Sequence, residues 1–241
     1  MKHVEQKIAD GRVLELIRGY LKQGVLEEHS QSEAGESGTP QGAVISPLLA
    51  NIYLDPLDQT MAARGSEMVR YADDFIILCR TQEEAEVALK AVQQWTAEVG
   101  LTLHPEKTRI VDATQPGGFD FLGYHFELGK KTPRKKSLEK FQESIRSVTR
   151  RTSGQSMKTI ISELTPKMRG WFNYFKHSRG WVFKKLDGWI RGRLRSILRK
   201  REGRKGRERG TDHRRWPNST FTALGFFSLE EALTAAKSLR K

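Results

Sequence analysis

Cysteine is almost absent from the sequence, with Cys79 the single residue of its kind. One cysteine excludes a disulfide framework and any cysteine-rich zinc site within one chain. The 6 histidines show no ligand spacing with cysteine or carboxylate, so we predict no zinc. A cysteine-poor chain is typical of a reducing compartment, and we expect a cytoplasmic location.

Long apolar runs are also missing. No stretch approaches the roughly 18 apolar residues needed to cross a bilayer, and the first residues contain no apolar signal-peptide core. We therefore predict a protein without a membrane partner. The oligomeric state is left open by the sequence.

Acidic residues are the third shortage, since 29 Asp and Glu face 42 Lys and Arg, a formal net charge of +13. Residues 130–215 hold 28 Lys and Arg against 7 Asp and Glu, a net +21, while the remaining residues carry −8. A solvated surface is the plain alternative. Here, however, arginine dominates among interleaved aromatic residues, so phosphate contact and base stacking are both available. This region is predicted to bind nucleic acid. The aromatic residues are Trp171, Phe172, Tyr174, Phe175, Trp181 and Trp189.

The first half of the chain mixes helix and strand patterns. Residues 12–26 place apolar side chains at three- and four-residue spacing, which predicts an amphipathic helix, and a loop rich in Ser, Glu and Gly is expected over 30–42. Ser46 followed by Pro47 predicts a helix start, and Pro56 is expected to bend or end that helix.

A hairpin is predicted over residues 68–79, which are apolar on both sides of a polar turn. Thr81 and Glu84 then predict a capping box for a helix that Gly100 closes. Further strand-like segments lie at 101–104, 108–111 and 119–128, with Pro and Gly residues supplying the turns.

The second half is helical and basic. Residues 200–215 are charged and contain glycine, which predicts a mobile basic loop, and Ser228 is expected to cap a last helix. The fold class is therefore α+β, with a mixed domain over 1–129 and a helical domain over 130–241. Helical periodicity marks three main segments, at 138–148, 160–175 and 186–197.

Two adjacent carboxylates, Asp73 and Asp74, occupy the predicted hairpin turn. Like charges side by side repel unless a cation or solvent relieves them. Carboxylate oxygens are ligands that Mg²⁺ prefers. The alternative is an ordinary turn, because aspartate tolerates the φ and ψ values that turns require. The dipeptide alone leaves both interpretations open.

Four segments in order resemble the motif series of group II intron-encoded reverse transcriptases. A helix is predicted between the second and the third. The basic helical part, with Leu164-Thr165-Pro166 and an aromatic run over 171–175, resembles the thumb, or maturase X domain, of the same family. The four segments are GTPQGAVISPLL at 38–49, YADD at 71–74, HPEKT at 104–108 and FLGY at 121–124.

The resemblance implies a partial reverse-transcriptase palm followed by a helical thumb. It implies an RNA-directed DNA polymerase that transfers nucleotides with two Mg²⁺ ions, Mn²⁺ being a possible substitute. Asp73 and Asp74 would be the catalytic metal ligands. The implied partners are intron or template RNA, a DNA primer and dNTP, with a further role in RNA splicing and intron mobility.

The resemblance also implies binding residues. Gly38 and Gly42 would let backbone approach the nucleotide closely, Gln41 would line its pocket, and Lys107 would organise the palm near substrate phosphate, a surface lysine being the alternative. The 121–124 segment would grip the primer, with plain sheet core as the competing interpretation. The implied substrate-binding residues are Gly38, Gln41, Gly42, Tyr71, Ala72, Lys107, Phe121, Leu122, Gly123 and Tyr124. The expected nucleic-acid contacts are Arg169, Trp171, Lys176, Lys184, Lys185, Arg191, Arg195, Arg199, Lys200, Arg201 and Arg204.

The sequence departs from the family in one respect. The family carries another catalytic aspartate on a palm strand before the helix that begins near Gly11, and residues 1–10 provide no such strand. We therefore expect the fingers and first palm strands to be missing, and activity of this chain alone to be impaired. A non-catalytic RNA-binding, maturase-like splicing factor or an inactive remnant is the alternative.

Overall fold

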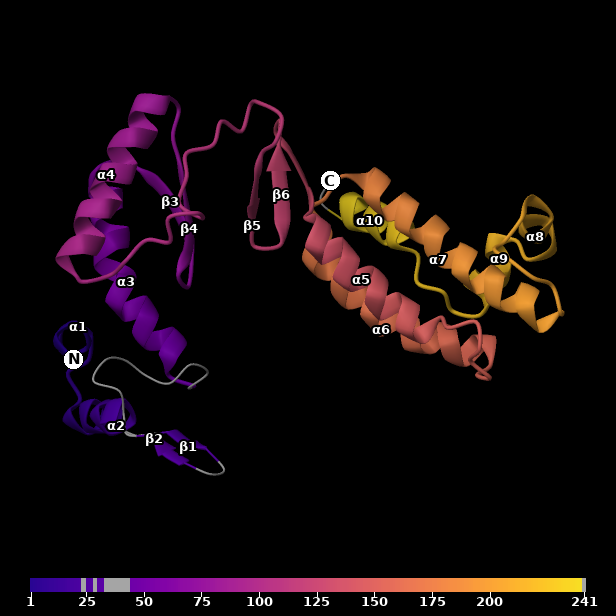
Figure 1. Ribbon diagram of the computed structural model, residues 1–241, viewed down its shortest axis with the longest axis horizontal. Coiled ribbons are helices and arrows are strands. Elements are labelled where there is room, and N and C mark those ends of the chain that lie inside the picture. Colours follow the sequence, from indigo (N-terminus) through magenta and orange to yellow (C-terminus); the bar gives the residue numbers. More distant parts are fainter. Residues whose placement is uncertain (23–24, 28–29, 33–43, 240–241) are drawn as a thin grey trace. The chain divides into compact units, whose positions relative to one another are not determined.

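The computed structural model describes the chain except for residues 23–24, 28–29, 33–43 and 240–241. The chain divides into two compact units, Met1–Ile110 and Val111–Lys241. Both helices and small antiparallel sheets are present, so the α+β class is confirmed (Figure 1). In the described ranges, no helix is both long and apolar enough to span a membrane.

Unit 1 is built around one hairpin covered by two helices. Strands β3 (Glu67–Tyr71) and β4 (Asp74–Leu78) pair antiparallel, as the alternation of their residues predicts. Apolar side chains of the hairpin pack against Leu57 and Met61 of one helix and Val92 of the other. Removing these side chains from water holds the three elements together. The two helices are α3 (Ser46–Ala63) and α4 (Gln82–Glu98).

The N-terminal elements of unit 1 are short. Helix α1 (Lys2–Lys7) is tied to α3 by an ion pair of 2.8 Å between Lys7 and Asp55. The predicted helix over 12–26 forms as α2 (Gly11–Lys22), but it ends earlier than expected, and β1 (Val25–Glu27) pairs with β2 (Ser30–Ser32). The predicted loop over 30–42 is thus wrong at its start, and its remainder lies outside the described residues.

Helix α3 continues through Pro56 to Ala63, so of the two outcomes expected for this proline, a bend or an end of the helix, the end is excluded. Leu57 and Met61, one and five residues after Pro56, are 1% and 0% exposed. Burying these two side chains offsets the hydrogen bond that proline cannot donate. Tertiary packing here outweighs the tendency of proline to end a helix.

The strands expected at 101–104 and 108–111 do not form. His104 instead closes a turn, because its carbonyl accepts hydrogen bonds from the amides of Lys107 (3.2 Å) and Thr108 (2.9 Å). A strand needs a neighbour to receive its backbone hydrogen bonds. Among the described residues of unit 1, the only paired strands are β1 with β2 and β3 with β4.

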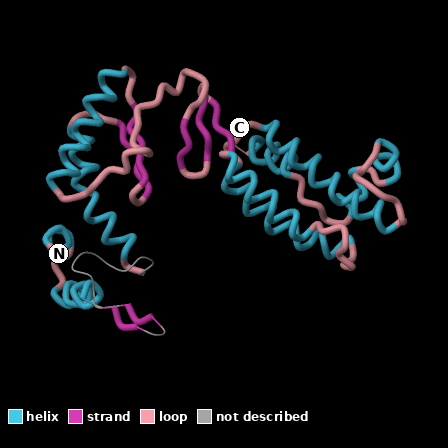
Figure 2. The backbone as a smooth tube through the Cα atoms, in the orientation of Figure 1, coloured by secondary structure: helices cyan, strands magenta, loops and turns pink. Residues whose placement is uncertain are grey.

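Unit 2 opens with a three-stranded antiparallel sheet (Figure 2). The expected strand over 119–128 is in fact a hairpin, β5 (Phe119–Phe121) and β6 (Tyr124–Glu127), and β7 (Lys130–Pro133) extends it. The sheet packs on the helices through aromatic contacts, including Tyr124 with Phe175 at 5.0 Å between ring centroids. The unit therefore begins at Val111, before the expected domain boundary at residue 129.

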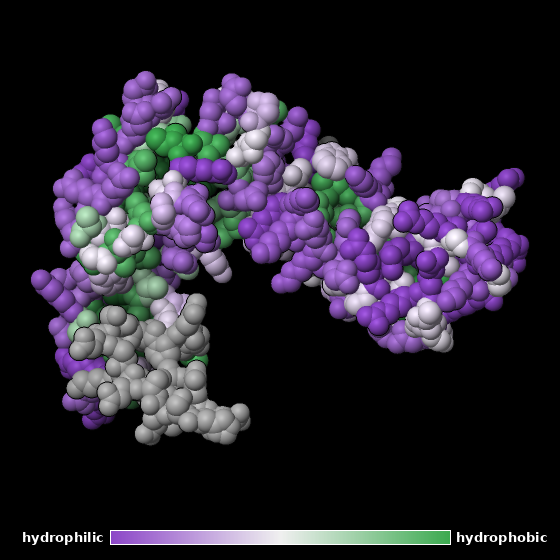
Figure 3. All heavy atoms as spheres, in the orientation of Figure 1, coloured by the Kyte–Doolittle hydropathy of each residue, from purple (hydrophilic) through white to green (hydrophobic). Residues whose placement is uncertain are grey.

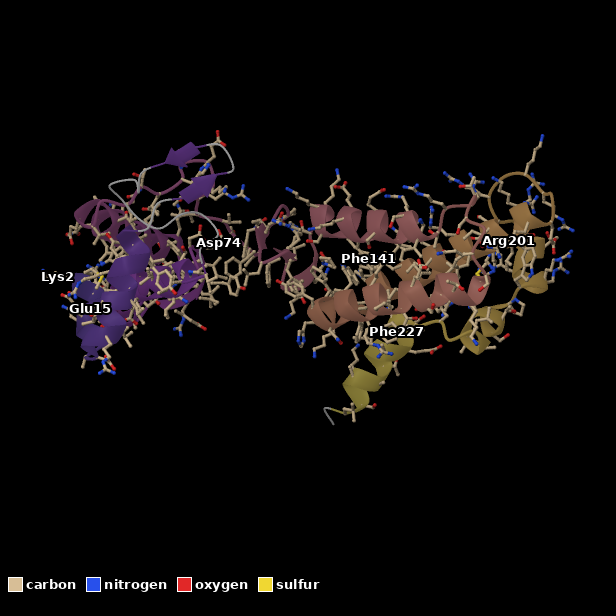
Figure 4. The ribbon with its side chains drawn as sticks, turned by 90° about the horizontal axis from the view of Figure 1, so that it is seen from below. Lys2, Glu15, Asp74, Phe141, Arg201 and Phe227 are labelled. Atoms are coloured by element: carbon tan, nitrogen blue, oxygen red, sulfur yellow. The ribbon has the colours of Figure 1, made fainter. Side chains whose placement is uncertain are left out.

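The three predicted helices form the body of unit 2 around one apolar core. Phe141, Phe183 and Leu194 are 4%, 0% and 0% exposed, and Figure 4 labels Phe141 among the helices. The helices are α5 (Lys135–Val148), α6 (Met157–Phe175) and α7 (Gly180–Arg201).

The C-terminal segment forms three short helices after a loop. After α7 the chain turns into α8 (Gly210–Arg215), α9 (Asn218–Ala223) and α10 (Leu229–Ser238). The predicted loop over 200–215 is correct for residues 202–209 and wrong for residues 210–215, which form α8. Asp212 of α8 is fully buried and pairs with Arg199 at 3.0 Å. The prediction that Ser228 caps the last helix is confirmed, since its Oγ accepts from the Glu231 amide at 3.2 Å.

Candidate active site and nucleic-acid interface

Asp73 and Asp74 lie where the sequence predicted them, at the tight turn of the β3–β4 hairpin. Tyr71 pairs with Asp74 across the strands, so Ala72 and Asp73 are the two central residues of the turn. Both aspartates are exposed, and Tyr71 is 67% exposed. Figure 4 labels Asp74 at the start of β4. A rigid strand pair therefore presents two adjacent carboxylates to solvent.

The backbone of this turn is strained. Ala72 has a φ of 54°, in the left-handed region that residues with a Cβ rarely occupy. Such a conformation costs roughly 1–3 kcal/mol and persists only where the surroundings hold it. The sharp reversal places the consecutive residues Asp73 and Asp74 at the end of the hairpin.

The donor set at this turn fits Mg²⁺. In polymerase sites, Mg²⁺ is commonly bound through one or two carboxylates plus substrate phosphates and water, and Asp73 and Asp74 supply two exposed carboxylates. Within the described ranges, no group of three or more His, Cys, Asp or Glu side chains is arranged to hold a metal. The two aspartates therefore form a partial ligand set.

Of the predicted nucleotide-binding residues of unit 1 outside the YADD turn, only Lys107 is among the residues that the structure describes. Lys107 is exposed and lies in the turn closed by His104. Gly38, Gln41 and Gly42 lie outside the described residues. In unit 1 the structure thus describes the YADD turn and Lys107 of the expected site.

The 121–124 segment forms a second tight turn, in unit 2. Leu122 and Gly123 have φ values of 47° and 79°. A Cβ on Gly123 would come within 3.3 Å of Ser137 Oγ. The start of α5 packs directly on the Gly123 backbone, because the Gly123 carbonyl accepts hydrogen bonds from Arg134 N (2.9 Å) and Ser137 Oγ (3.0 Å). Glycine therefore meets both requirements here, positive φ and close packing.

Two tyrosines fix this turn on helix α6. Tyr174 Oη donates to the Leu122 carbonyl at 2.8 Å, and Tyr124 Oη donates to the Tyr174 carbonyl. Burial, helped by the charge of Tyr174, raises the pKa of Tyr124 to about 12. Phe121 and Tyr124 are half-buried. Sheet packing and the expected primer grip remain compatible.

Exposed cations cover the helical part of unit 2, and hydrophilic side chains dominate its visible face in Figure 3. Lys176 is half-buried. Arg201 lies at the end of α7 among many nitrogen-bearing side chains (Figure 4). Six of the expected nucleic-acid contacts are exposed: Arg169, Lys184, Lys185, Lys200, Arg201 and Arg204.

Three expected contacts are instead buried, and we no longer assign RNA binding to them. Arg191, Arg195 and Arg199 are only 9%, 2% and 7% exposed. Arg195 Nε donates to the Trp216 carbonyl at 2.9 Å, and Arg199 pairs with Asp212. The buried Arg191 lies over the ring of Phe226 and 4.0 Å from Asp187. All three guanidinium groups thus face neighbours within the unit rather than solvent phosphate. Trp171 is likewise used in the core, stacked on Phe141 at 4.5 Å between ring centroids.

Sequence analysis missed three residues that support the YADD turn. Arg70, next to Tyr71, contacts Asn51 and Asp58 of α3 as well as the turn backbone. Asn51 and Asp58 are seven residues apart and thus share one face of a helix. The seven-residue spacing of two polar residues in a helix, together with an arginine in a strand that is otherwise largely apolar, could have indicated this contact from the sequence.

Comparison with known families matches both units in chain order. The family described as reverse transcriptase (RNA-dependent DNA polymerase) matches residues 4–126, just over half of the 241 residues. The family described as group II intron, maturase-specific domain matches residues 138–216. The two matches therefore cover the four motif segments and the basic helical part that resemble this family.

Curated relatives agree with these matches. Protein YkfC of Escherichia coli is 28% identical over 159 residues, which covers 52% of this chain and 41% of that protein. The group II intron-encoded protein LtrA of Lactococcus lactis is 50% identical over 56 residues, 23% of this chain and 9% of that protein. An uncharacterized 91 kDa protein in a cob intron of Schizosaccharomyces pombe is 44% identical over 169 residues, 46% of this chain and 21% of that protein. The chain thus spans less than half the length of each of these relatives. The chain belongs to the group II intron reverse transcriptase and maturase family.

Proposed function

We propose that the chain contributes the metal-binding turn and the RNA-binding domain of an RNA-directed DNA polymerase. Its substrates are template or intron RNA, a DNA primer and dNTP, and its RNA binding serves splicing and intron mobility. The observation that carries the proposal is the pair of exposed carboxylates, Asp73 and Asp74, on a strained two-residue turn. We assign residues 1–129 to the palm and 130–241 to the thumb, as the motif order implies.

In this proposal each part of the turn has a chemical task. Asp73 and Asp74 supply hard oxygen ligands and hold them on a rigid strand pair. When bound, the metal ions lower the pKa of the primer 3′ hydroxyl and stabilise the departing pyrophosphate. The exposed Tyr71 ring and the Ala72 backbone border these carboxylates on the N-terminal side. Gln41 and Lys107 would contact the nucleotide, and 121–124 the primer.

The helical unit supplies RNA affinity. Its exposed lysines and arginines would neutralise phosphate charge and release counterions whatever the base sequence. Trp181, 59% exposed, lies one helical turn before Lys184 and Lys185. One stretch of α7 therefore offers a ring for base stacking beside two cations for phosphate.

One observation favours the second candidate, a maturase-like RNA-binding protein without catalysis. The family resemblance implies a further catalytic aspartate beside these two, and among the residues that the structure describes no third acidic group joins Asp73 and Asp74. This candidate predicts full RNA affinity and no nucleotide incorporation under any metal condition.

Primer extension on an RNA template tests the proposed function. The chain is assayed with Mg²⁺ or Mn²⁺, alone and with a fingers-and-palm fragment of a family member, and RNA affinity is measured in parallel. We expect incorporation that Asp73→Asn or Asp74→Asn abolishes while RNA affinity changes less than about twofold, because these carboxylates serve chemistry. Glu67→Gln, an exposed carboxylate at the other end of the hairpin, is the matched control.

The outcomes separate the candidates. RNA binding with no incorporation in either setting supports the non-catalytic protein. Undiminished incorporation by either aspartate variant overturns the assignment of the turn.

A further inference from the structure

The side chain of Arg70 links the YADD turn to helix α3. Its Nη1 donates to the Ala72 carbonyl at 2.9 Å and to Asn51 Oδ1 at 2.9 Å. Its Nε and Nη2 donate to the carboxylate of Asp58 at 2.8 Å and 2.5 Å. One guanidinium thus joins two positions on α3 to the peptide that connects Ala72 with Asp73.

Charge and burial show that Arg70 is committed to this arrangement. Its side chain is 11% exposed and that of Asp58 is 37% exposed. The hydrogen bond to Asp58 raises the pKa of Arg70, so the guanidinium is charged at every accessible pH. Asp58 offsets the positive charge of Arg70, which weakens the repulsion between Arg70 and a metal cation bound at the turn. The main effect of Arg70 is therefore to position the backbone of the turn.

The strained backbone explains why the turn needs such support. Ala72 has a φ of 54°, and neither Ala72 nor Asp73 is a glycine. A two-residue turn with left-handed φ usually places Gly or Asn there. The hydrogen bond from Arg70 holds the carbonyl of the strained residue, and through its peptide bond it fixes the amide of Asp73. Only a planar fork of several donors reaches all three acceptors at once.

We infer that Arg70 is a positioning residue for the metal site: it locks the Ala72–Asp73 peptide onto α3 and thereby fixes the direction of the Asp73 and Asp74 carboxylates. This inference rests on the proposed function, in which these carboxylates bind a divalent metal. Groups that orient metal ligands affect affinity by roughly 10- to 100-fold when they are changed.

Backbone dynamics of the full chain test the locking directly and need no metal. In wild type, the ¹⁵N order parameter of the Asp73 amide should match that of the strands, about 0.85, and in Arg70→Met it should fall towards 0.6. Arg70→Lys keeps the charge but lacks the fork, so it should resemble Arg70→Met. Arg80→Met, an exposed arginine just beyond the other end of the hairpin, should leave Asp73 ordered. An Asp73 amide as ordered in both Arg70 variants as in wild type overturns the inference.

Mn²⁺ binding, followed by the loss of the free-ion resonance, tests the consequence. We expect Arg70→Lys and Arg70→Met to weaken Mn²⁺ binding about tenfold, and Arg80→Met to leave it unchanged. A purely structural arginine would lower the melting temperature of unit 1 and leave Mn²⁺ affinity at the wild-type value, which would contradict the inference. Mn²⁺ binding that survives Asp73→Asn with Asp74→Asn instead overturns the proposed function, while the Asp73 order parameter still decides the role of Arg70.

Discussion

The charged residues of the two units are used in opposite ways. At the hairpin of unit 1, Asp73 and Asp74 are adjacent like charges left exposed. In unit 2, Arg191, Arg195 and Arg199 are almost completely buried and joined to partners of the same unit. The local net charge of +21 therefore overstates what RNA can contact, since part of it serves folding.

Helical periodicity explains the division within unit 2. Arg191, Arg195 and Arg199 are four residues apart and form one row along α7, on the face that α8, α9 and α10 cover. Arg191 lies over the ring of Phe226 at 4.9 Å, and Arg195 over that of Phe221 at 5.4 Å. This row fastens the C-terminal segment to α7, whereas Lys184, Lys185 and Lys200, off the row, face solvent.

The largest expected effect comes from breaking the row. Arg199→Met leaves the buried Asp212 without its main cation, and removing one partner of a buried pair costs about 3 kcal/mol of unfolding free energy. Lys200→Met, the exposed neighbour, should cost under about 0.5 kcal/mol. Urea unfolding followed by tryptophan fluorescence measures both, because four of the 5 tryptophans lie in unit 2. Equal losses for the two variants would contradict the division into structural and surface cations.

The next effect concerns RNA. Lys184, Lys185 and Lys200 are exposed, and replacing all three with Gln should flatten the log–log dependence of RNA affinity on salt by about 2, given roughly 0.7 to 0.9 per phosphate contact. Unfolding free energy should hardly change. Replacing Lys2, Arg64 and Lys90, which are exposed in unit 1, in the same way is the control. An identical slope change in the control would show that RNA affinity follows total charge rather than this surface.

A smaller effect is expected from Asp187, which is buried on α7 and accepts from Ser228 Oγ at 2.7 Å and the Leu229 amide at 3.1 Å. Burial raises its pKa, and these hydrogen bonds oppose the rise only partly. The folded state then binds more protons than the unfolded state between the two pKa values. Unfolding free energy should therefore fall as pH rises from the unfolded value of about 3.9 through the folded pKa.

Asp187→Asn replaces the titrating carboxyl with an amide. Urea unfolding of the wild type and of this variant, measured between the unfolded and folded pKa values of Asp187, therefore isolates the contribution of this carboxyl to the free energy of unfolding. The stability advantage of wild type over the variant should shrink as pH rises. An advantage that grows with pH would show that the folded protein prefers the charged carboxylate.

The sequence predicted those elements whose signals are local. The β3–β4 hairpin, the Thr81 cap, whose Oγ1 accepts from the Glu84 amide at 3.2 Å, and the helices α5 to α7 are confirmed. The sequence left open whether Pro56 bends or ends α3, and it missed helix α8 (Gly210–Arg215), because both outcomes depend on burial between distant segments. Arg70 was missed for the same reason, since its partners lie on another element.

The most direct test of the metal site is cleavage of the chain by bound iron. Fe²⁺ can take the place of Mg²⁺ at oxygen ligands, and with ascorbate and peroxide it cuts the backbone nearest to it. We expect a cut within residues 71–75 that excess Mg²⁺ suppresses and that Asp73→Asn with Asp74→Asn removes. Cleavage elsewhere only, or a cut at this turn that persists in the double variant, would contradict the claim that these two aspartates hold the metal.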